Sequence, residues 1–174
     1  ENTENGDYEA QTNSYAYTID NNLHMLNSNK EHIAITNFTN KNIVAGKSIH
    51  REEFGITKGT FWSPKGNFLA FYQMDQTEVT DYMLLDYKTV PATANPIKYP
   101  MAGQNSHYAS VGIFNTKTLS TLYLKTKGEK DHYLTNLAWS PDEKLIYLAE
   151  LNREQNLMQL NTYDAATGNF INSL

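Results

Sequence analysis

The chain has 174 residues, a formal net charge of -5 at pH 7 and no cysteine. This length suits one domain with a sizeable core, and the absence of cysteine excludes a disulfide framework and cysteine-based metal sites. Acidic and basic residues are scattered, so the sequence lacks the basic stripe that is typical of nucleic-acid binding. No apolar run reaches the roughly 18–20 residues of a membrane-spanning helix.

The N-terminal part of the chain indicates short antiparallel strands. Tyrosine is frequent, with 12 residues, and long helix-forming windows are absent, which favours strands. Residues 1–13 are polar and are expected to be poorly ordered. Between Ser14 and Thr36, three short apolar segments alternate with the turn sequences DNN and NSNK, a pattern typical of a meander with tight loops. Because the chain begins in a polar stretch and ends in a strand-like one, we expect it to be part of a longer protein.

The next segments surround a Trp-Ser-Pro corner. Asn40–Lys47 is interpreted as a connector, and His50–Phe54 as a short helical turn. Thr60–Trp62 and Phe68–Gln73 are predicted strands on either side of Ser63–Gly66, which has proline second and glycine fourth, as a type I turn prefers.

A proline-rich stretch follows. Tyr82–Tyr87 is predicted to be an apolar strand, but Thr89–Gly103 holds three of the five prolines. Proline cannot donate to a sheet ladder, so residues 78–103 are expected to form an edge or an extended excursion from the sheet. Further strands are then predicted at Tyr108–Phe114, Ser120–Lys125, His132–Trp139, Lys144–Leu151, Leu157–Tyr163 and Asn169–Leu174.

A repeat is the strongest architectural signal. The segments FWSPKGNFLAFY (Phe61–Tyr72) and AWSPDEKLIYLAE (Ala138–Glu150) share Trp-Ser-Pro, a polar turn and an apolar strand. Repeated four-stranded meanders with this corner indicate propeller blades, whereas a packed β-sandwich would give similar strands without the repeated corner. We therefore predict an all-β chain, a partial β-propeller of about three antiparallel four-stranded blades, with a short helical insertion near residues 50–55.

The common motifs of catalysis and cofactor binding are absent. The sequence contains no G-x-S-x-G elbow, H-E-x-x-H, P-loop or dinucleotide fingerprint, so no cofactor is expected. Ser63 and Ser140 each lie between tryptophan and proline, which makes them structural residues of turns. His50 and Glu53 have the spacing of half a metal site, but no third ligand accompanies them and no metal is expected. The other four histidines are interpreted as hydrogen-bonded or surface residues.

Glu52 and Glu53 are the candidate binding residues. Two neighbouring carboxylates repel each other, and a cation bound between them relieves that repulsion. A peptide α-ammonium offers one positive charge and three N–H donors, so charge-assisted hydrogen bonds would fix it in place. The same spacing also fits a solvated acidic turn or an ion pair with Arg51, since exposed acids are common.

These segments resemble the N-terminal propeller domain of dipeptidyl peptidase IV-like serine exopeptidases, in the bacterial branch of the prolyl oligopeptidase clan. The combination of EEF (Glu52–Phe54), WSP (Trp62–Pro64) and KYPMAG (Lys98–Gly103) is specific, and the resemblance covers nearly the whole chain. The similar runs are Ile49–Tyr72, Met74–Tyr82, Ile97–Gly103, His132–Asn156 and Tyr163–Gly168.

The resemblance implies an eight-bladed propeller that caps an α/β-hydrolase domain, with residues 1–174 as an incomplete propeller domain. Glu52 and Glu53 match the acidic pair that grips the substrate's free amino terminus, which implies release of N-terminal dipeptides with proline or alanine second. The run HREEFG is one residue shorter than in better-known members. The Ser-Asp-His triad belongs to the hydrolase domain and has no counterpart here, so the chain alone is expected to be non-catalytic.

The resemblance also implies partners and a location. Residues 78–103 correspond to an extended arm that helps to form a homodimer, although a flap packed on its own blade would also fit. The arm residues that suit an interface are Tyr82, Leu84, Leu85, Tyr87 and Tyr99. The expected partners are the peptide substrate, the C-terminal hydrolase domain of the same chain and a second copy, with no nucleic acid and no membrane span. A periplasmic or otherwise exported location is expected, and a non-enzymatic protein-binding propeller and a tripeptide-releasing relative are the alternatives.

Overall fold

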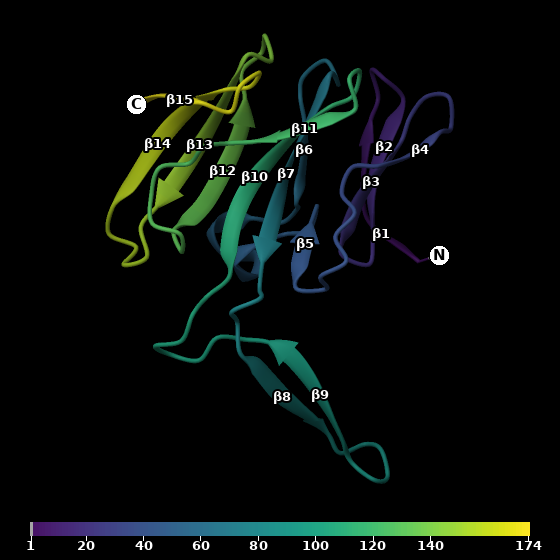
Figure 1. The fold of residues 1–174 in the computed structure, drawn as a ribbon, viewed down its shortest axis with the longest axis vertical. Helices are drawn as coiled ribbons and strands as arrows, with labels where there is room; N and C mark the ends of the chain where they lie inside the picture. The colour runs from purple at the N-terminus through teal and green to yellow at the C-terminus, as the bar shows by residue number, and fades with distance from the viewer. Residues whose placement is uncertain (1) are drawn as a thin grey trace.

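The computed structural model describes residues 2–174, which form an all-β structure (Figure 1). Three antiparallel sheets stand side by side, and a separate two-stranded hairpin, β8–β9, projects away from one end of the array. The two ends of the chain lie on opposite flanks of the array. Over residues 2–174, no helix is long and apolar enough to cross a membrane.

Each sheet is a blade that the chain fills strand by strand. Apart from the hairpin, and from β5 and β6, which both pair with β7, strands that follow one another in the chain are neighbours in their sheet, which is the meander of a propeller blade. Blade 1 contains β1 (Thr3–Glu9), β2 (Ser14–Ile19), β3 (Asn22–Leu26) and β4 (His32–Ala34). Blade 2 contains β5 (Ile43–Ala45), β6 (Thr60–Trp62), β7 (Phe68–Asp75), β10 (Tyr108–Asn115) and β11 (Ser120–Tyr123). Blade 3 contains β12 (Tyr133–Trp139), β13 (Leu145–Leu151), β14 (Met158–Asp164) and β15 (Phe170–Ser173). The hairpin consists of β8 (Asp81–Asp86) and β9 (Thr93–Lys98).

The core lies between the blades. Leu69 and Phe71 of β7 pack with residues of blade 1, whereas Ala70 and Tyr72, on the opposite face of the same strand, pack with residues of blade 3. All four side chains are at most 1% exposed. A buried leucine or aromatic side chain contributes about 1.5–3 kcal/mol, so this stack is stabilised across the blade boundaries. A central sheet that is covered on both faces confirms the partial propeller and rules out a two-layer sandwich.

The two Trp-Ser-Pro corners have the same hydrogen bonds. The N–H of Phe68 donates to Ser63 Oγ at 2.9 Å, and the N–H of Leu145 donates to Ser140 Oγ at 2.9 Å. Each serine N–H in turn donates to the carbonyl of that same residue, at 2.9 Å in both corners. The hydroxyls therefore close the turns, which confirms that both serines are structural.

Each corner tryptophan reaches back to the preceding blade. Trp62 Nε1 donates to the carbonyl of Asp7 in blade 1 at 3.2 Å, and Trp139 Nε1 donates to the carbonyl of Phe61 in blade 2 at 2.9 Å. The repeat seen in the sequence is thus a repeated contact between blades, which explains why the motif carries a tryptophan.

A buried carboxylate, that of Glu143, joins the corner of blade 3 to the corner of blade 2. Its Oε1 accepts hydrogen bonds from Ser63 Oγ at 2.6 Å and from the N–H of Lys65 at 2.7 Å, and its Oε2 accepts one from Asn67 Nδ2 at 2.7 Å. Burial raises the pKa of Glu143, but these hydrogen bonds outweigh burial and hold the pKa below its usual range.

Two sequence-based expectations about strands were wrong. Residues 1–13 were expected to be poorly ordered, but Thr3–Glu9 forms the first strand of blade 1, with Glu1 outside the described residues. Most side chains of this strand are polar and exposed, so its sequence lacks the apolar alternation by which a strand is predicted. Asn40–Lys47 was interpreted as a connector, but Ile43–Ala45 pairs with β7.

Candidate functional site

The insertion, residues 46–59, interrupts the first strand of blade 2. β5 and β6 both pair with β7, one on each side of Tyr72. The N–H of Gly46 donates to the carbonyl of Tyr72 at 2.9 Å, and the N–H of Tyr72 donates to the carbonyl of Gly59 at 2.9 Å. The ladder is therefore continuous through Tyr72, and the insertion leaves and re-enters the strand at a single point.

Two glycines make this narrow base possible. A Cβ atom on Gly59 would lie 2.2 Å from the carbonyl oxygen of Lys47, far inside van der Waals contact. Gly46 has a φ of +76°, which side chains of other residues disfavour. The two legs of the insertion thus touch through their backbones, and this contact fixes the direction in which the insertion leaves the blade.

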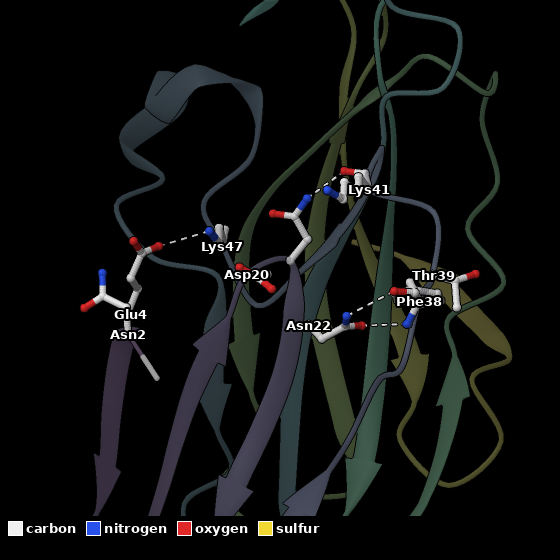
Figure 2. A pocket seen from close by; sticks show the side chains of 9 residues that line it. Asn2, Glu4, Asp20, Asn22, Phe38, Thr39, Lys41 and Lys47 are labelled. Carbon is white, nitrogen blue, oxygen red and sulfur yellow. Dashed lines mark hydrogen bonds and ion pairs between the residues drawn. The ribbon is translucent and has the colours of Figure 1, made fainter.

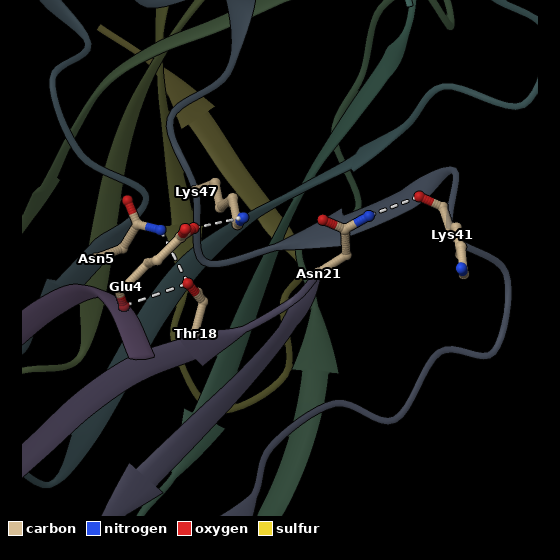
Figure 3. Close-up of polar contacts among 6 residues, drawn as sticks. All are labelled: Glu4, Asn5, Thr18, Asn21, Lys41 and Lys47. Atoms are coloured by element: carbon tan, nitrogen blue, oxygen red, sulfur yellow. Dashed lines mark hydrogen bonds and ion pairs between the residues drawn. The ribbon is translucent and has the colours of Figure 1, made fainter. Parts of the chain in front are cut away.

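The other two blades have an irregularity at the level of the insertion. The pairing of β1 with β2 shifts around Asn5, and the pairing of β12 with β13 shifts between Thr135 and Ala138, around Asn136. Both asparagines have positive φ, 53° and 48°. Asn5 also donates from Nδ2 to Thr18 Oγ1 at 2.8 Å (Figure 3). Bulges often lie next to active sites, and in blade 2 the bulge position is expanded into the insertion.

The short helical insertion predicted near residues 50–55 is present as the 3-10 segment η1 (His50–Gly55). Its backbone, however, is left-handed: His50, Arg51, Glu52 and Phe54 all have φ between 51° and 63°. Such a conformation costs a non-glycine residue roughly 1–2 kcal/mol, so the surroundings must hold it. Strained backbone of this kind is concentrated at functional sites.

The acidic pair, Glu52 and Glu53, is exposed on this segment. Ser48 Oγ donates to Glu52 Oε1 at 3.3 Å. Across residues 2–174 neither carboxylate takes part in an ion pair. The expected alternative of an ion pair with Arg51 is therefore wrong. Arg51 instead donates from Nη2 to the carbonyl of Lys98 at 2.9 Å.

Next to the acidic pair, the side chain of His50 is buried and hydrogen-bonded through both ring nitrogens. The N–H of Leu134 in blade 3 donates to His50 Nε2 at 3.1 Å, so the proton of the neutral ring is on Nδ1. Nδ1 then donates to Nε2 of His107 at 2.9 Å. Burial lowers the pKa of His50 to about 3, with smaller contributions from His107, His132 and Arg153. A neutral His50 thus ties the insertion to blade 3.

A second layer of side chains supports His50. Burial lowers the pKa of His107 to about 4, with further lowering by Arg51 and Arg153. The ring of Tyr133 lies 5.0 Å from the rings of both His50 and Phe54, measured between centroids. Both nitrogens of His50 take part in hydrogen bonds. In the described part of the chain no group of three or more His, Asp or Glu side chains could hold a metal ion.

The arm, residues 78–103, carries exposed apolar side chains. Figure 1 shows its hairpin projecting away from the blades and not packed as a flap on its own blade. The residues predicted to suit an interface are between 41% and 83% exposed; they are Tyr82, Leu84, Leu85, Tyr87 and Tyr99. An isolated two-stranded hairpin is marginally stable in water, so this apolar surface calls for a partner.

A cavity of about 500 Å³ lies apart from the acidic pair, beside the turn between β2 and β3 (Figure 2). Lys47 and Glu4 form an ion pair of 3.1 Å at its edge, and Phe38 donates from its N–H to Asn22 Oδ1 at 2.7 Å. Its charged lining consists of Glu4, Asp20, Lys41 and Lys47. Two carboxylates and two ammonium groups give it no preference for one sign of charge.

Sequence reasoning placed the acidic pair but missed the side chains that support it. His50 was considered as half of a metal site, and His107 as an ordinary polar residue. The bond between the two histidines joins positions 57 residues apart, and the bond from Arg51 to Lys98 spans 47 residues. No local pattern encodes contacts at such separations. The only available signal in the sequence was a histidine, His50, two residues before the acidic pair.

This arrangement suits the binding of a cation. Two exposed carboxylates without a paired cation stand on a stiff insertion that is anchored to blades 2 and 3. Carboxylates accept charge-assisted hydrogen bonds, which are roughly twice as strong as neutral ones. A ligand that presents an ammonium group would find acceptors already in place.

Comparisons with known proteins point in one direction. Dipeptidyl peptidase 4 of Sus scrofa is 31% identical over 142 residues, which cover 72% of this chain and 18% of that protein. Dipeptidyl aminopeptidase B of Saccharomyces cerevisiae is 29% identical over 140 residues, which cover 74% of this chain and 17% of that protein. The chain therefore spans about a fifth of the length of these curated relatives.

Solved structures agree. A Bacteroides ovatus structure, provisionally named a dipeptidyl aminopeptidase IV, is 48% identical with a TM-score of 0.90 over 99% of this chain and 24% of that chain. Dipeptidyl peptidase 4 of Porphyromonas gingivalis shares the fold, with a TM-score of 0.84, 23% identity and coverage of 92% of this chain and 24% of that chain. The family described as the dipeptidyl peptidase IV (DPP IV) N-terminal region matches residues 3–172. The chain therefore belongs to the dipeptidyl peptidase IV N-terminal region family.

Proposed function

We propose that this chain is the propeller part of a longer serine exopeptidase, and that Glu52 and Glu53 bind the free amino terminus of its peptide substrate. One observation carries the proposal: an exposed acidic pair, without ion pairs in residues 2–174, stands on a strained insertion. Membership of a family whose relatives are named dipeptidyl peptidases supports it.

The physical basis is charge pairing. An α-ammonium between the two carboxylates relieves their repulsion and donates up to three hydrogen bonds. A hydrogen bond to a charged group contributes about 1.5–3 kcal/mol. This corresponds to a preference of about 10- to 100-fold for a free amino terminus over a blocked one.

A clamp on the amino terminus would also set the length of the product. Only a short piece of the peptide would extend from the clamp to the nucleophile, so the enzyme would release dipeptides, with proline or alanine second. The serine nucleophile and its Asp and His partners are assigned to a C-terminal α/β-hydrolase domain of the same protein. Residues 1–174 alone would be non-catalytic.

The test uses the full-length protein with Gly-Pro, Ala-Ala and tripeptidyl reporter substrates, each with a free and with a blocked amine. Cleavage of the dipeptidyl reporters that is lost on blocking the amine is the expected result. Cleavage of blocked substrates would contradict the clamp, and cleavage of tripeptidyl reporters alone would assign the chain to a tripeptide-releasing enzyme. No cleavage of any reporter would favour a protein-binding propeller.

We also propose that the arm pairs with a second copy of the protein, because its exposed apolar side chains need cover. Leu85→Asp in the full-length protein should convert a dimer into a monomer in sedimentation experiments, whereas Lys88→Asp on the same arm should not. An unchanged dimer in Leu85→Asp would contradict this assignment. The exported, periplasmic location stays a prediction, which cell fractionation of the native host would check.

A further inference from the structure

The base of the arm lies against the insertion. The guanidinium carbon of Arg51 is 4.0 Å from the centroid of the Tyr99 ring, a cation–π contact. The same guanidinium donates to the carbonyl of Lys98 at 2.9 Å. Arg51 is thus held by two neighbouring groups of the arm, and it immediately precedes the acidic pair in the chain.

The base of the arm is itself fixed. Lys98 Nζ donates to the carbonyl of Val79 at 2.9 Å and lies 3.1 Å from the carboxylate of Asp81. The N–H of Tyr99 donates to the carbonyl of Thr80 at 3.0 Å. These bonds join the outgoing and returning strands of the arm, so the groups that hold Arg51 do not move independently of each other.

A cavity of about 190 Å³ separates the rest of the arm base from the insertion. Its lining includes Ser48 and Arg51 from the insertion and Lys98, Pro100 and His107 from the arm and the segment after it. The two elements are therefore not packed tightly against each other there. Arg51 is therefore held by its contacts with Tyr99 and the Lys98 carbonyl at the edge of this cavity.

We infer that Tyr99 and the Lys98 carbonyl keep the Arg51 guanidinium away from Glu52 and Glu53, so that the carboxylates stay available to a substrate ammonium. This inference rests on the proposed amino-terminus clamp. An arginine next to two carboxylates competes strongly with a substrate ammonium for them, because its planar fork donates two parallel hydrogen bonds to one carboxylate. Released from the arm, Arg51 would neutralise the acidic pair from within the protein. Tyr99 is a positioning residue in this scheme, because it acts on the acidic pair only through Arg51.

The test measures KM for a free-amine Gly-Pro reporter with the full-length protein. Tyr99→Ala should raise KM by about three- to fivefold with little change in kcat, as expected for the loss of one partly exposed cation–π contact. Arg51→Ala alone should leave KM within about twofold, because it removes the competing guanidinium itself, so the contact with Tyr99 is no longer needed. The double variant R51A/Y99A should return KM to the value of Arg51→Ala.

That recovery is the decisive outcome, because a purely structural role of Tyr99 would leave the double variant as impaired as Tyr99→Ala. Tyr99→Phe, which keeps the ring, and Tyr87→Ala, which removes an aromatic ring 83% exposed on the arm, serve as matched controls and should both retain the original KM. An unchanged KM in Tyr99→Ala, or no recovery in the double variant, overturns the inference.

Two further measurements separate this inference from the clamp itself. Glu52→Gln and Glu53→Gln should each raise KM; unchanged KM in both would overturn the clamp and the inference together. Raised KM in these variants without the Arg51-dependent recovery would overturn the inference alone. Thermal unfolding of each variant checks the fold, and if Tyr99→Ala unfolds, Tyr99→Leu takes its place because it keeps an apolar side chain without the ring.

Discussion

Blades 2 and 3 share one plan, but blade 2 departs from it twice. In blade 3 the strands follow one another with short connections from β12 to β15. In blade 2 the first strand is split by the insertion, and the connection from β7 to β10 is lengthened into the arm. The Trp-Ser-Pro corners of the two blades, by contrast, keep the same hydrogen bonds.

This difference separates the residues that hold the blades together from the residues of the candidate site. The corners, the Trp contacts and the Glu143 link hold the blades together, and they lie where both blades follow the common plan. The insertion and the arm lie where blade 2 leaves it, and they meet through Arg51. His50 of the insertion also bonds to His107, in the segment that follows the arm. The two departures therefore lie together in the candidate site, and four variants test this difference between the blades.

Loss of the acidic pair has the largest expected effect. In the full-length enzyme, Glu52→Ala or Glu53→Ala should lower kcat/KM on dipeptidyl reporters by about 10- to 100-fold, because each removes a charged hydrogen-bond acceptor for the ammonium. Ser48→Ala removes only a 3.3 Å hydrogen bond to Glu52 and should change the rate by less than about threefold. Near-normal activity in both glutamate variants would remove the assignment.

Gly59→Ala should have the second-largest effect, a loss of stability at the base of the insertion. Its Cβ would lie 2.2 Å from the Lys47 carbonyl oxygen, so the two legs of the insertion must separate, at an expected cost of about 2–3 kcal/mol in the free energy of unfolding. Gly103→Ala is the matched control. That glycine has a positive φ, +80°, which Gly59 does not have, but no atom lies within 4 Å of its Cβ, so we expect a loss of about 1 kcal/mol. Equal denaturation midpoints for the two variants would show that the contact at the base is not tight.

Glu143→Gln tests the common plan. The carboxylate accepts three hydrogen bonds from the corner of blade 2, and neutralising it should lower the free energy of unfolding by about 1–2 kcal/mol at pH 7. Its folded-state pKa lies below the unfolded value, so this stabilisation is present above about pH 4.5 and is lost as the pH falls further. Glu154→Gln, at an exposed loop, should have no comparable effect. Denaturant titrations at pH 7 and pH 4 make the comparison.

The contribution of His50 is the smallest predicted effect at pH 7, and at lower pH it appears as a slope of stability against pH. Its pKa of about 3 in the folded protein lies below the unfolded value of 6.5, so the unfolded state binds the additional proton between these pH values. Stability should therefore fall as the pH drops below 6.5, by at most about 1.4 kcal/mol per pH unit. His50→Gln should flatten this slope. Parallel slopes for the original protein and His50→Gln would contradict the burial of a neutral ring.

Local patterns predicted the fold well because the blades repeat. The Trp-Ser-Pro corners and the alternating segments predicted three blades and most strand positions. β1 was missed because its side chains are polar and exposed, and β5 was missed because three residues carry too little periodicity. The left-handed backbone of η1 was also missed, since HREEFG contains no residue before Gly55 that favours positive φ.

The candidate site was predicted in part. Adjacent carboxylates, together with the family resemblance, indicated Glu52 and Glu53. The direction taken by Arg51 was not predictable, because two carboxylates beside it in the chain offered a nearer partner than the arm. Its contact with Tyr99 depends on where the arm returns to the blade, which is a property of the tertiary structure.

The tryptophan contacts all run in the same direction, from one blade to the blade before it in the chain. Asp7 and Phe61, whose carbonyls accept the hydrogen bonds from Trp62 and Trp139, each lie just before the corner level of their own blade. The corresponding position of blade 3 is Ala138, which is exposed. A further blade with the same corner, packed on this flank, would find an acceptor in the equivalent position.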